Sequence, residues 1–246
     1  MVGNSTRVAL VTGGSRGIGR AIAERLGRDG LQIAIGYVGN TGAANEAVGS
    51  IVDAGGEAIA IQADVADEQA VAAMFDRTEA NFGGVDVVVN SAGRLALSTI
   101  AEQDLDVFDD LHRTNVRGAF VVAQQAARRL RDGGAFIGMS TSVVGTQFPA
   151  YGAYVASKSA VEGMTMILAR ELRGRNITAN LVAPGPTATD LFLDGKSQEQ
   201  IDTLAHVSPL ERLGTPEDIA RVVSFLASAD GHWVNGQTLR ANGGMV

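Results

Sequence analysis

Residues 12–19 read Thr-Gly-Gly-Ser-Arg-Gly-Ile-Gly; they follow an apolar run at 7–12 and open a helical pattern at 17–28. The apolar run has the length of a buried strand, so the quoted stretch is a strand-to-helix turn. Glycines in such a turn let backbone N–H groups approach a pyrophosphate, and the helix N-terminus favours the anion. The spacing Gly-xxx-Gly-x-Gly differs from the common G-x-G-x-x-G fingerprint. Its place after the first strand nevertheless predicts a dinucleotide site made by Gly13, Ser15, Arg16, Gly17, Ile18 and Gly19.

Beyond this turn, apolar runs of strand length alternate with longer helical patterns. Further strands are expected at residues 31–37, 57–62, 85–90, 135–139, 177–182 and 237–241. Helices are expected at residues 42–54, 67–82, 103–131, 151–173 and 215–227. Apolar strands joined by helices form a parallel sheet that is covered on both faces. The pattern predicts a Rossmann-like α/β fold, a doubly wound parallel seven-stranded sheet in a three-layer α/β/α sandwich, with ligands outside the carboxyl ends of the strands.

Composition argues against several classes of function. The 246 residues are 46% hydrophobic and their glycines are spread along the chain, which favours one domain over residues 1–246. The net charge of −7 and the lack of a basic run argue against a nucleic-acid partner. Cysteine is absent, and His112, His206 and His232 lack ligand spacing, so we expect no metal site. Without a run of 18 apolar residues, we expect no membrane contact and a cytoplasmic location.

A second pattern lies in the helix expected at residues 151–173. Tyr154 and Lys158 stand four residues apart, on one helix face and about a turn from each other. A phenol has a pKa of about 10, and a nearby ammonium lowers it, which makes a general acid/base that works near neutral pH. Taken alone, the pair also fits an ordinary helix with a half-buried tyrosine and a solvated lysine, because two-residue patterns arise by chance.

The glycine-rich turn also permits a rival function. Residues 13–17 match G-x-S-x-G, the nucleophile elbow of α/β-hydrolases, with Ser15 as the nucleophile. Asp218 and His232 follow in the order Ser, Asp, His. A hydrolase needs a strand and a loop before the elbow to build its oxyanion hole, and only 12 residues precede Gly13. The layout therefore disfavours a serine hydrolase.

Taken together, the motifs of the chain resemble those of the short-chain dehydrogenase/reductase family. They span nearly the full length in order: Thr12 to Gly19 (TGxxxGxG), Asp64-Val65, Asn90-Ser91-Ala92-Gly93 (NNAG-like), Asn115, Ser142, Tyr154-xxx-Lys158 and Pro184-Gly185. Two positions depart from the family pattern: Ser91 replaces a common Asn, and Asn242 replaces a common Asp before two glycines. The resemblance implies an NAD(P)-dependent oxidoreductase that transfers hydride between nicotinamide and a carbonyl or secondary alcohol. It extends to reductases of carrier-linked 3-oxoacyl groups.

The resemblance also implies roles for four residues. Tyr154 donates a proton to the carbonyl oxygen, and Lys158 lowers the pKa of that tyrosine and bonds the nicotinamide ribose. Asn115 supports a water-linked proton relay through Lys158. Ser142 holds the carbonyl oxygen, and two hydroxyls that converge on one oxygen stabilise the alkoxide developing there.

Three hydroxyl residues, Ser140, Thr141 and Ser142, follow the expected fifth strand. In the family the catalytic serine usually precedes a short apolar pair and a glycine. Ser142-Val143-Val144-Gly145 fits that pattern, so Ser142 is the expected catalytic hydroxyl.

The end of the second expected strand bears on cofactor choice. An NAD-selecting site offers an Asp or Glu there to the ribose 2′-OH, but residues 33–45 contain no acidic residue. Arg16, flanked by Tyr37 and Asn40, either pairs with a 2′-phosphate, which arginine suits, or is simply solvated. Resemblance to the NADP-preferring members of the family favours NADP(H) over NAD(H).

The family resemblance assigns the remaining cofactor contacts. It implies Asp64 and Val65 at the adenine, and Asn90, Ser91, Ala92 and Gly93 at the ribose. The alternative for Asp64 is a structural role at a strand end or as a helix cap. It also implies Pro184, Gly185, Thr187 and Thr189 at the nicotinamide.

Residues 187–213 separate the sixth strand from the last helix and have the length of a lid-like insertion. Its apolar side chains, with Leu95 and Phe148, fit either a partly apolar small-molecule substrate or packing of the lid. Arg128, Arg129 and Arg131 either dock an acidic acyl carrier protein or complement the dipole of a helix end; the negative net charge favours the second.

The resemblance implies a homotetramer or a dimer. A cofactor-binding regulator without turnover is a further alternative, and the intact set of Asn115, Ser142, Tyr154 and Lys158 argues against it.

Overall fold

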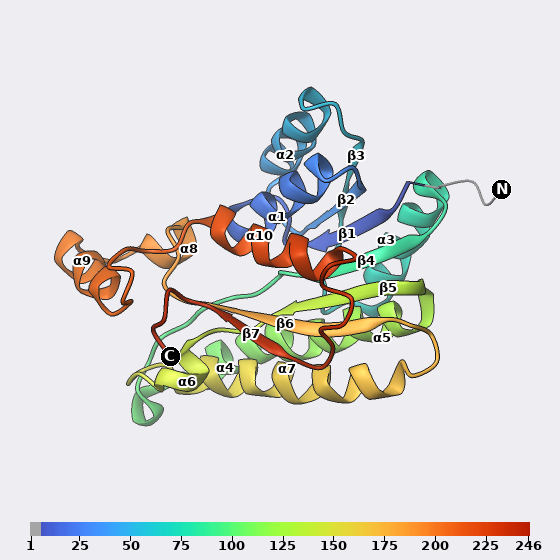
Figure 1. The fold of residues 1–246 in the computed structure, drawn as a ribbon. Helices are drawn as coiled ribbons and strands as arrows, with labels where there is room; N and C mark the ends of the chain where they lie inside the picture. The colour runs from blue at the N-terminus through green and yellow to red at the C-terminus, as the bar shows by residue number, and fades with distance from the viewer. Residues whose placement is uncertain (1–5) are drawn as a thin grey trace.

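The structure, a computed structural model, describes residues 6–246 and contains one seven-stranded sheet between layers of helices (Figure 1). All strands run parallel, in the order β3-β2-β1-β4-β5-β6-β7. This is the Rossmann-like doubly wound fold that the sequence predicts, and all seven predicted strands occur. Their bounds are β1 (Val8–Thr12), β2 (Gln32–Tyr37), β3 (Ala58–Gln62), β4 (Val85–Asn90), β5 (Leu130–Met139), β6 (Thr178–Pro184) and β7 (Thr238–Ala241).

Helices cover both faces of this sheet. One face packs against α1 (Gly17–Arg28), α2 (Thr41–Asp53) and α10 (Pro216–Ala227). The other packs against α3 (Glu68–Phe82), α5 (Ala119–Arg129) and α7 (Gly152–Glu171). Shorter helices connect them: η1 (Ile100–Glu102), α4 (Leu105–His112), η2 (Arg113–Gly118), α6 (Val143–Thr146), α8 (Asp190–Leu193) and α9 (Gln198–His206).

The two cores explain why residues 8–11 of β1 are all apolar. Successive side chains of a strand point to opposite faces. Ala9 and Val11 therefore belong to the core beneath α1 and α10, whereas Leu10 belongs to the core beneath α3 and α5. Every residue of β1 is buried, and each large apolar side chain so buried contributes about 1.5–3 kcal/mol. Thr12 at the end of the strand is polar, but its buried hydroxyl is hydrogen-bonded. An unpaired polar residue at positions 8–11 would be costly, which is why the sequence shows an apolar run rather than an alternation.

The long helical region expected at residues 103–131 is helical from Leu105 to Arg129, but it is not one regular α-helix and it ends earlier than expected. The segment is divided into α4, the π-helical η2 and α5, and β5 already begins at Leu130. The π turn η2 is only six residues long, which is shorter than the window over which helical periodicity is read, so the sequence pattern does not reveal it. Arg131 consequently lies in a strand and not at a helix end.

The topology places the carboxyl ends of the strands at one edge. β1 lies between β2 and β4, so the strand order reverses there. In open α/β sheets, ligands bind at the carboxyl ends of the strands at such a switch point. The segment carrying α8 and α9 projects at this edge, on the left of Figure 1. None of the helices in residues 6–246 has the length and apolar character needed to cross a membrane.

Candidate active site

The glycine-rich turn is packed too closely for side chains. Gly13 and Gly17 adopt positive φ angles of 64° and 54°, which favour glycine. A Cβ on Gly19 would lie 2.2 Å from the carbonyl oxygen of Gly13, and a Cβ on Gly13 would lie 2.9 Å from the backbone of Ala92. Helix α1 then starts without a side-chain cap and without an acidic residue in its first turn. Its first N–H groups are therefore available to an anion.

A threonine joins this turn to the end of β4. The hydroxyl of Thr12 donates to Asn90 Oδ1 at 2.7 Å and accepts a hydrogen bond from the N–H of Ala92 at 3.2 Å. The bond to Asn90 is buried. The predicted pyrophosphate turn and the predicted ribose segment Ser91-Ala92-Gly93 are thus one connected surface.

The residues predicted to select the cofactor lie at the start of α1 and at the end of β2 or just after it. Arg16 is exposed and forms no ion pair with any residue in the range 6–246. Tyr37 is buried with its hydroxyl 3.3 Å from that of Thr41. Asn40 is the N-cap of α2, and its side chain accepts from the N–H of Ala43 at 2.9 Å. Asn40 thus has a structural role that spacing alone did not indicate.

Asp64, the predicted adenine ligand, is held by an arginine that sequence reasoning missed. Its Oδ2 accepts from Arg113 Nη1 at 2.8 Å, and its Oδ1 accepts from the N–H of Ala66 at 2.9 Å. Burial raises the pKa of this carboxyl, but the bonds from Ala66 and Arg113 outweigh burial and leave the pKa below its usual value. Val65 is buried and would touch any Cβ on Gly118, so a glycine is needed where η2 passes it.

Asn115 lies in the π-helical turn η2 and is buried. Its amide donates to the carbonyl of Arg94 at 2.9 Å and to Ser157 Oγ at 3.1 Å, and its Oδ1 accepts from the N–H of Arg94 at 2.8 Å. The side chain thus ties the loop after β4 to helix α7. A Cβ on Gly93 would lie 3.4 Å from Asn115 Oδ1 and 3.5 Å from Lys158 Nζ, so this glycine sits between the two predicted catalytic residues.

Tyr154 and Lys158 occupy the first turns of α7, as their spacing predicts. The Lys158 ammonium donates to the carbonyl of Met139 at 2.9 Å and lies 5.8 Å from the centre of the Tyr154 ring. Burial raises the pKa of Tyr154 to about 12, and burial lowers the pKa of Lys158 to about 8. The expected lowering of the tyrosine pKa by the lysine does not dominate, because desolvation penalises the charged form of each group.

The three hydroxyls after β5 point to different partners. Ser140 Oγ donates to Glu162 of α7 at 2.5 Å. Ser142 Oγ donates to the carbonyl of Ala183 at 3.0 Å and accepts from Asn242 Nδ2 at 2.9 Å. The hydroxyl of Thr141 hydrogen-bonds the phenol of Tyr154, which opposes the rise in the pKa of that tyrosine.

The loop after β6 closes over the glycine-rich turn. Ser142 donates its N–H to Pro184, and Gly185 donates its N–H to Ala241. Thr187 Oγ1 donates to Gly185 at 2.9 Å. Thr189 caps α8, and its methyl carbon lies 3.5 Å from the place that a Cβ on Gly17 would take. The residues predicted at the nicotinamide thus adjoin those predicted at the pyrophosphate.

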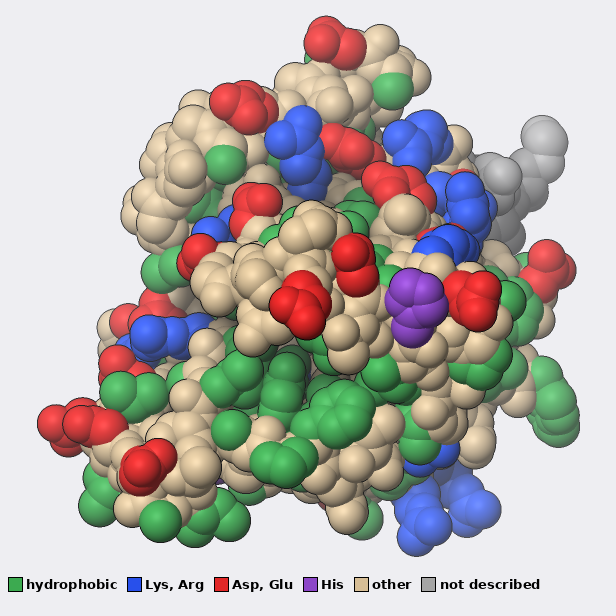
Figure 2. All heavy atoms as spheres, turned by 90° about the vertical axis from the view of Figure 1, so that its left-hand side faces the viewer, with side chains coloured by type: hydrophobic (Ala, Val, Ile, Leu, Met, Phe, Trp, Pro, Cys, Tyr) green, Lys and Arg blue, Asp and Glu red, His purple; other side chains and the backbone are tan. Residues whose placement is uncertain are grey.

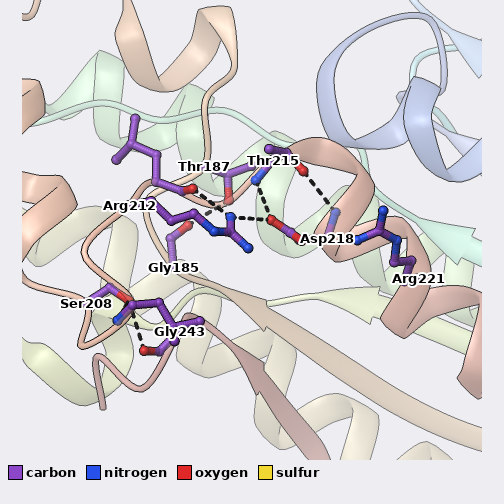
Figure 3. A network of polar contacts seen from close by, with 10 residues as sticks. Gly185, Thr187, Ser208, Arg212, Thr215, Asp218, Arg221 and Gly243 are labelled. Carbon is purple, nitrogen blue, oxygen red and sulfur yellow. Dashed lines mark hydrogen bonds and ion pairs between the residues drawn. The ribbon is translucent and has the colours of Figure 1, made fainter.

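The insertion at residues 187–213 is fastened at both ends. Thr187 pairs with Gly214, and Ala188 donates to Gly214 at 2.9 Å. Arg212 Nη1 donates to Asp218 Oδ2 at 2.6 Å, and Ser208 Oγ donates to the carbonyl of Gly243 at 2.9 Å (Figure 3). The α8–α9 arm extends between these anchors.

Apolar side chains lie near the candidate site on the face of the protein that carries α8 and α9. Phe148, Tyr151 and Tyr154 form a row with ring centroids 6.3 and 6.4 Å apart. Figure 2 shows hydrophobic side chains gathered in the lower middle of this face. Exposed apolar residues in the neighbouring loops and helices include Leu97, Ile100, Leu105, Leu191, Val207 and Leu210.

The rival hydrolase triad is not assembled. Asp218 accepts from Arg212, from the N–H of Thr215 and from Arg221. No hydrogen bond within residues 6–246 joins it to His232 or Ser15. Figure 3 shows these partners of Asp218 around the base of α10.

Comparisons with known proteins agree with this geometry. The family model described as enoyl-(acyl carrier protein) reductase matches residues 13–246. A short-chain type dehydrogenase/reductase of Picea abies is 47% identical over 98% of this chain and 92% of the relative. A chloroplastic NADPH-dependent aldehyde reductase-like protein of Arabidopsis thaliana is 44% identical over 98% and 94%. A short chain dehydrogenase from Burkholderia cenocepacia, solved in complex with NADP, is 38% identical, covers 97% of each chain and has a TM-score of 0.92.

Proposed function

This chain belongs to the short-chain dehydrogenase/reductase family and is an oxidoreductase, and we propose that it reduces a small-molecule carbonyl to an alcohol, or catalyses the reverse. Its cofactor is NADP(H), in keeping with NADPH-dependent relatives and NADP-bound structural neighbours. The observation that supports this proposal most strongly is the position of Gly93, which lies between Asn115 and Lys158. The preceding residue, Ala92, lies against Gly13 of the glycine-rich turn. Together the two residues join the candidate catalytic residues to the pyrophosphate turn.

The turn fits a dinucleotide. Side chains at Gly13 and Gly19 would collide with backbone atoms, so only glycine leaves the N–H groups of this turn open to a pyrophosphate. Exposed Arg16 is available to a 2′-phosphate, and an acidic competitor is absent from residues 33–45. Asp64 and Val65 would hold the adenine, residues 90–93 the ribose, and Pro184, Gly185, Thr187 and Thr189 the nicotinamide.

The mechanism assigns the proton to Tyr154. With a pKa of about 12, its phenol is protonated at neutral pH and can donate to the oxygen of a carbonyl under reduction. When bound, NADPH supplies the hydride for the carbonyl carbon. Lys158, with a pKa of about 8, is mostly protonated at pH 7 and returns the proton to Tyr154. Asn115 fixes the loop beside Lys158 and supports this relay. A hydroxyl from residues 140–142 holds the substrate oxygen; the sequence pattern assigns it to Ser142.

The substrate is proposed to carry an apolar or aromatic portion. The row formed by Phe148, Tyr151 and Tyr154 supports this, because aromatic side chains bind flat apolar groups. We propose one domain over residues 1–246, with residues 187–213 as the lid. Assembly as a homotetramer or dimer stays a prediction from the family resemblance. A cytoplasmic location stays a prediction from the lack of a long apolar run, and two of the plant relatives are chloroplastic.

A reductase of carrier-linked 3-oxoacyl groups is the second candidate, since the matching family model describes an acyl-carrier-protein reductase. Of the three arginines proposed for carrier docking, Arg128 is exposed, but the other two do not favour this function. Arg129 pairs with Asp76 and Glu79, each at 2.6 Å. Arg131 donates to Asp86 and to the carbonyl of Gly83. These charges are already neutralised within the chain.

The test is NADPH oxidation with a panel of ketones, aldehydes and carrier-linked 3-oxoacyl groups. We expect turnover of a small carbonyl compound and a loss of about 10²–10⁴-fold in kcat for Tyr154→Phe, with NADPH binding retained. NADPH binding without any turnover by the wild type would instead support the regulator. Full activity of Tyr154→Phe would remove this tyrosine from the mechanism.

A further inference from the structure

The catalytic hydroxyl beside Tyr154 can be identified from the hydrogen bonds of residues 140–142. One hydroxyl group has a single proton to donate. A residue whose proton already satisfies a buried acceptor cannot also donate to a substrate without leaving that acceptor unpaired. The three candidates differ in how their protons are used.

The hydroxyl of Ser142 is fully used in hydrogen bonds to other parts of the protein. Ser142 is 1% exposed, and its proton goes to the carbonyl of Ala183 at 3.0 Å. Its oxygen accepts from Asn242 Nδ2 at 2.9 Å, and the same amide nitrogen lies 3.2 Å from the carbonyl oxygen of Val246. Ser142 therefore fastens the C-terminal segment to the ends of β5 and β6. Turning its hydroxyl toward Tyr154 would break both contacts.

The hydroxyl of Ser140 is used in a hydrogen bond to helix α7. Its proton goes to Glu162 at 2.5 Å, one helical turn beyond Lys158 on α7. A hydrogen bond to a carboxylate is among the stronger ones in proteins. Ser140 thus holds the end of β5 against α7 and has no proton left for a ligand.

In the described part of the chain, the hydroxyl of Thr141 donates to neither a main-chain carbonyl nor a carboxylate. Thr141 is 8% exposed, and its oxygen accepts only a long hydrogen bond of 3.3 Å from the N–H of Val143. Apart from the Tyr154 phenol, no group in residues 6–246 receives a hydrogen bond from its hydroxyl. Met139, two residues before Thr141, accepts from Lys158, so the segment lies against the catalytic face of α7.

We propose that Thr141, rather than Ser142, is the catalytic hydroxyl that holds the substrate carbonyl oxygen together with Tyr154, and that Ser142 positions the C-terminal segment. This rests on the proposed carbonyl reduction. In that reaction Tyr154 gives up its proton to the oxygen, whereas Thr141 donates a hydrogen bond and keeps its proton. Because Thr is branched at Cβ, its χ1 angle is restricted, and the hydroxyl is held ready for this donation.

Contact with the phenol gives independent support. The hydrogen bond from Thr141 lowers the pKa of Tyr154 against the larger rise caused by burial. Neither Ser140 nor Ser142 contributes to that pKa. Of the three hydroxyls, the one that hydrogen-bonds the proton donor is therefore Thr141 and not the Ser142 that the sequence pattern favours.

The experiment compares Thr141→Val, Thr141→Ser, Ser142→Ala and Ser140→Ala on the best substrate of the carbonyl panel. Removing one donor to a developing oxyanion costs about 10²–10³-fold in kcat, so we expect that loss for Thr141→Val, with NADPH binding unchanged. Thr141→Ser should stay within about tenfold of the wild type. The proposal requires the loss in Ser142→Ala to be at least about tenfold smaller than in Thr141→Val. A smaller difference, or a larger loss in Ser142→Ala, overturns it.

A second measurement needs no turnover. The chain has three tyrosines, so the ¹³Cζ NMR signal of Tyr154 can be assigned by comparison with Tyr154→Phe. Thr141→Val should shift that signal, and Ser142→Ala and Ser140→Ala should not. If Thr141→Val folds poorly, Thr141→Ala takes its place. A wild type without turnover would refute the proposed function, and an unmoved Tyr154 signal in the Thr141 variant would refute this inference separately.

Discussion

The ammonium of Lys158 donates its hydrogen bond to a main-chain carbonyl, that of Met139 at 2.9 Å, and not to a carboxylate. Within residues 6–246 it has no acidic partner. The burial that lowers its pKa from 10.5 to about 8 is therefore uncompensated by an opposite charge. Such a shift corresponds to about 3 kcal/mol of lost stability while the group is charged. A charge retained at that cost is consistent with a role in the reaction.

The first prediction is that Lys158→Met stabilises the protein while abolishing activity. The variant removes the buried charge but loses a hydrogen bond worth about 1 kcal/mol, so we expect a net gain of about 2 kcal/mol at pH 7. Urea unfolding measures the gain, and NADPH oxidation measures the lost activity. A destabilised variant at pH 7 would mean that Lys158 is not held as an uncompensated charge.

The same pair of proteins gives a pH dependence of stability. The pKa of Lys158 is lower in the folded protein, about 8, than in the unfolded chain, 10.5. Between these values the unfolded state binds more protons, so the stability of the wild type rises with pH. The advantage of Lys158→Met should be complete below pH 8 and should vanish as the pH approaches 10.5. A pH-independent difference in unfolding free energy would contradict the assigned pKa.

The second prediction concerns activity against pH. If protonated Lys158 returns the proton to Tyr154, kcat for reduction should be level near pH 6–7 and fall with an apparent pKa of about 8. Lys158→Arg stays protonated throughout this range. Any activity that Lys158→Arg retains should not show the fall in kcat with an apparent pKa of about 8. A fall at the same pH in both proteins would place the titrating group elsewhere.

The third prediction tests cofactor choice at Arg16. A charged hydrogen bond to phosphate is worth about 1.5–3 kcal/mol, so Arg16→Ala should weaken NADPH binding by about 10–100-fold and leave NADH binding nearly unchanged. Arg28→Ala is the matched control, because it removes the same charge from the other end of α1. Fluorescence titration gives both affinities. Equal losses of NADPH affinity in Arg16→Ala and Arg28→Ala would mean that Arg16 acts only through the net charge of the protein.

The fourth prediction concerns backbone strain just before the catalytic helix. Ala150 has φ of +67°, in the left-handed region. That conformation costs a non-glycine residue about 1–2 kcal/mol, and glycine gives back about 0.4–1 kcal/mol of this through unfolded-state entropy. Ala150→Gly should therefore gain about 0.5–1 kcal/mol in unfolding free energy. Ala153→Gly, inside α7, is the control and should lose about 1 kcal/mol.

Much of the fold followed from local patterns. The turn after β1 was recognisable from its glycines. The structure requires glycine at these positions, because a Cβ at Gly13 or Gly19 would meet backbone atoms. The apolar run of β1 reflects burial on both faces. The π-helical turn was not predictable, since it is a change of hydrogen-bond register over six residues, fewer than the window over which helical periodicity is read. The strand position of Arg131 was also missed, because its pairing with Asp86 joins residues 45 positions apart.

For the site, the sequence by itself determined which residue types are available and at what spacing. Tyr154 and Lys158 share a helix face because four residues make about one turn. Only the tertiary structure decided the partners of each group: Arg113 on Asp64, Asn242 on Ser142, and Thr141 on Tyr154. It also decided that burial governs the pKa of Tyr154 and of Lys158. Hydrogen bonding and desolvation depend on distances between segments remote in the chain, which a local pattern does not contain.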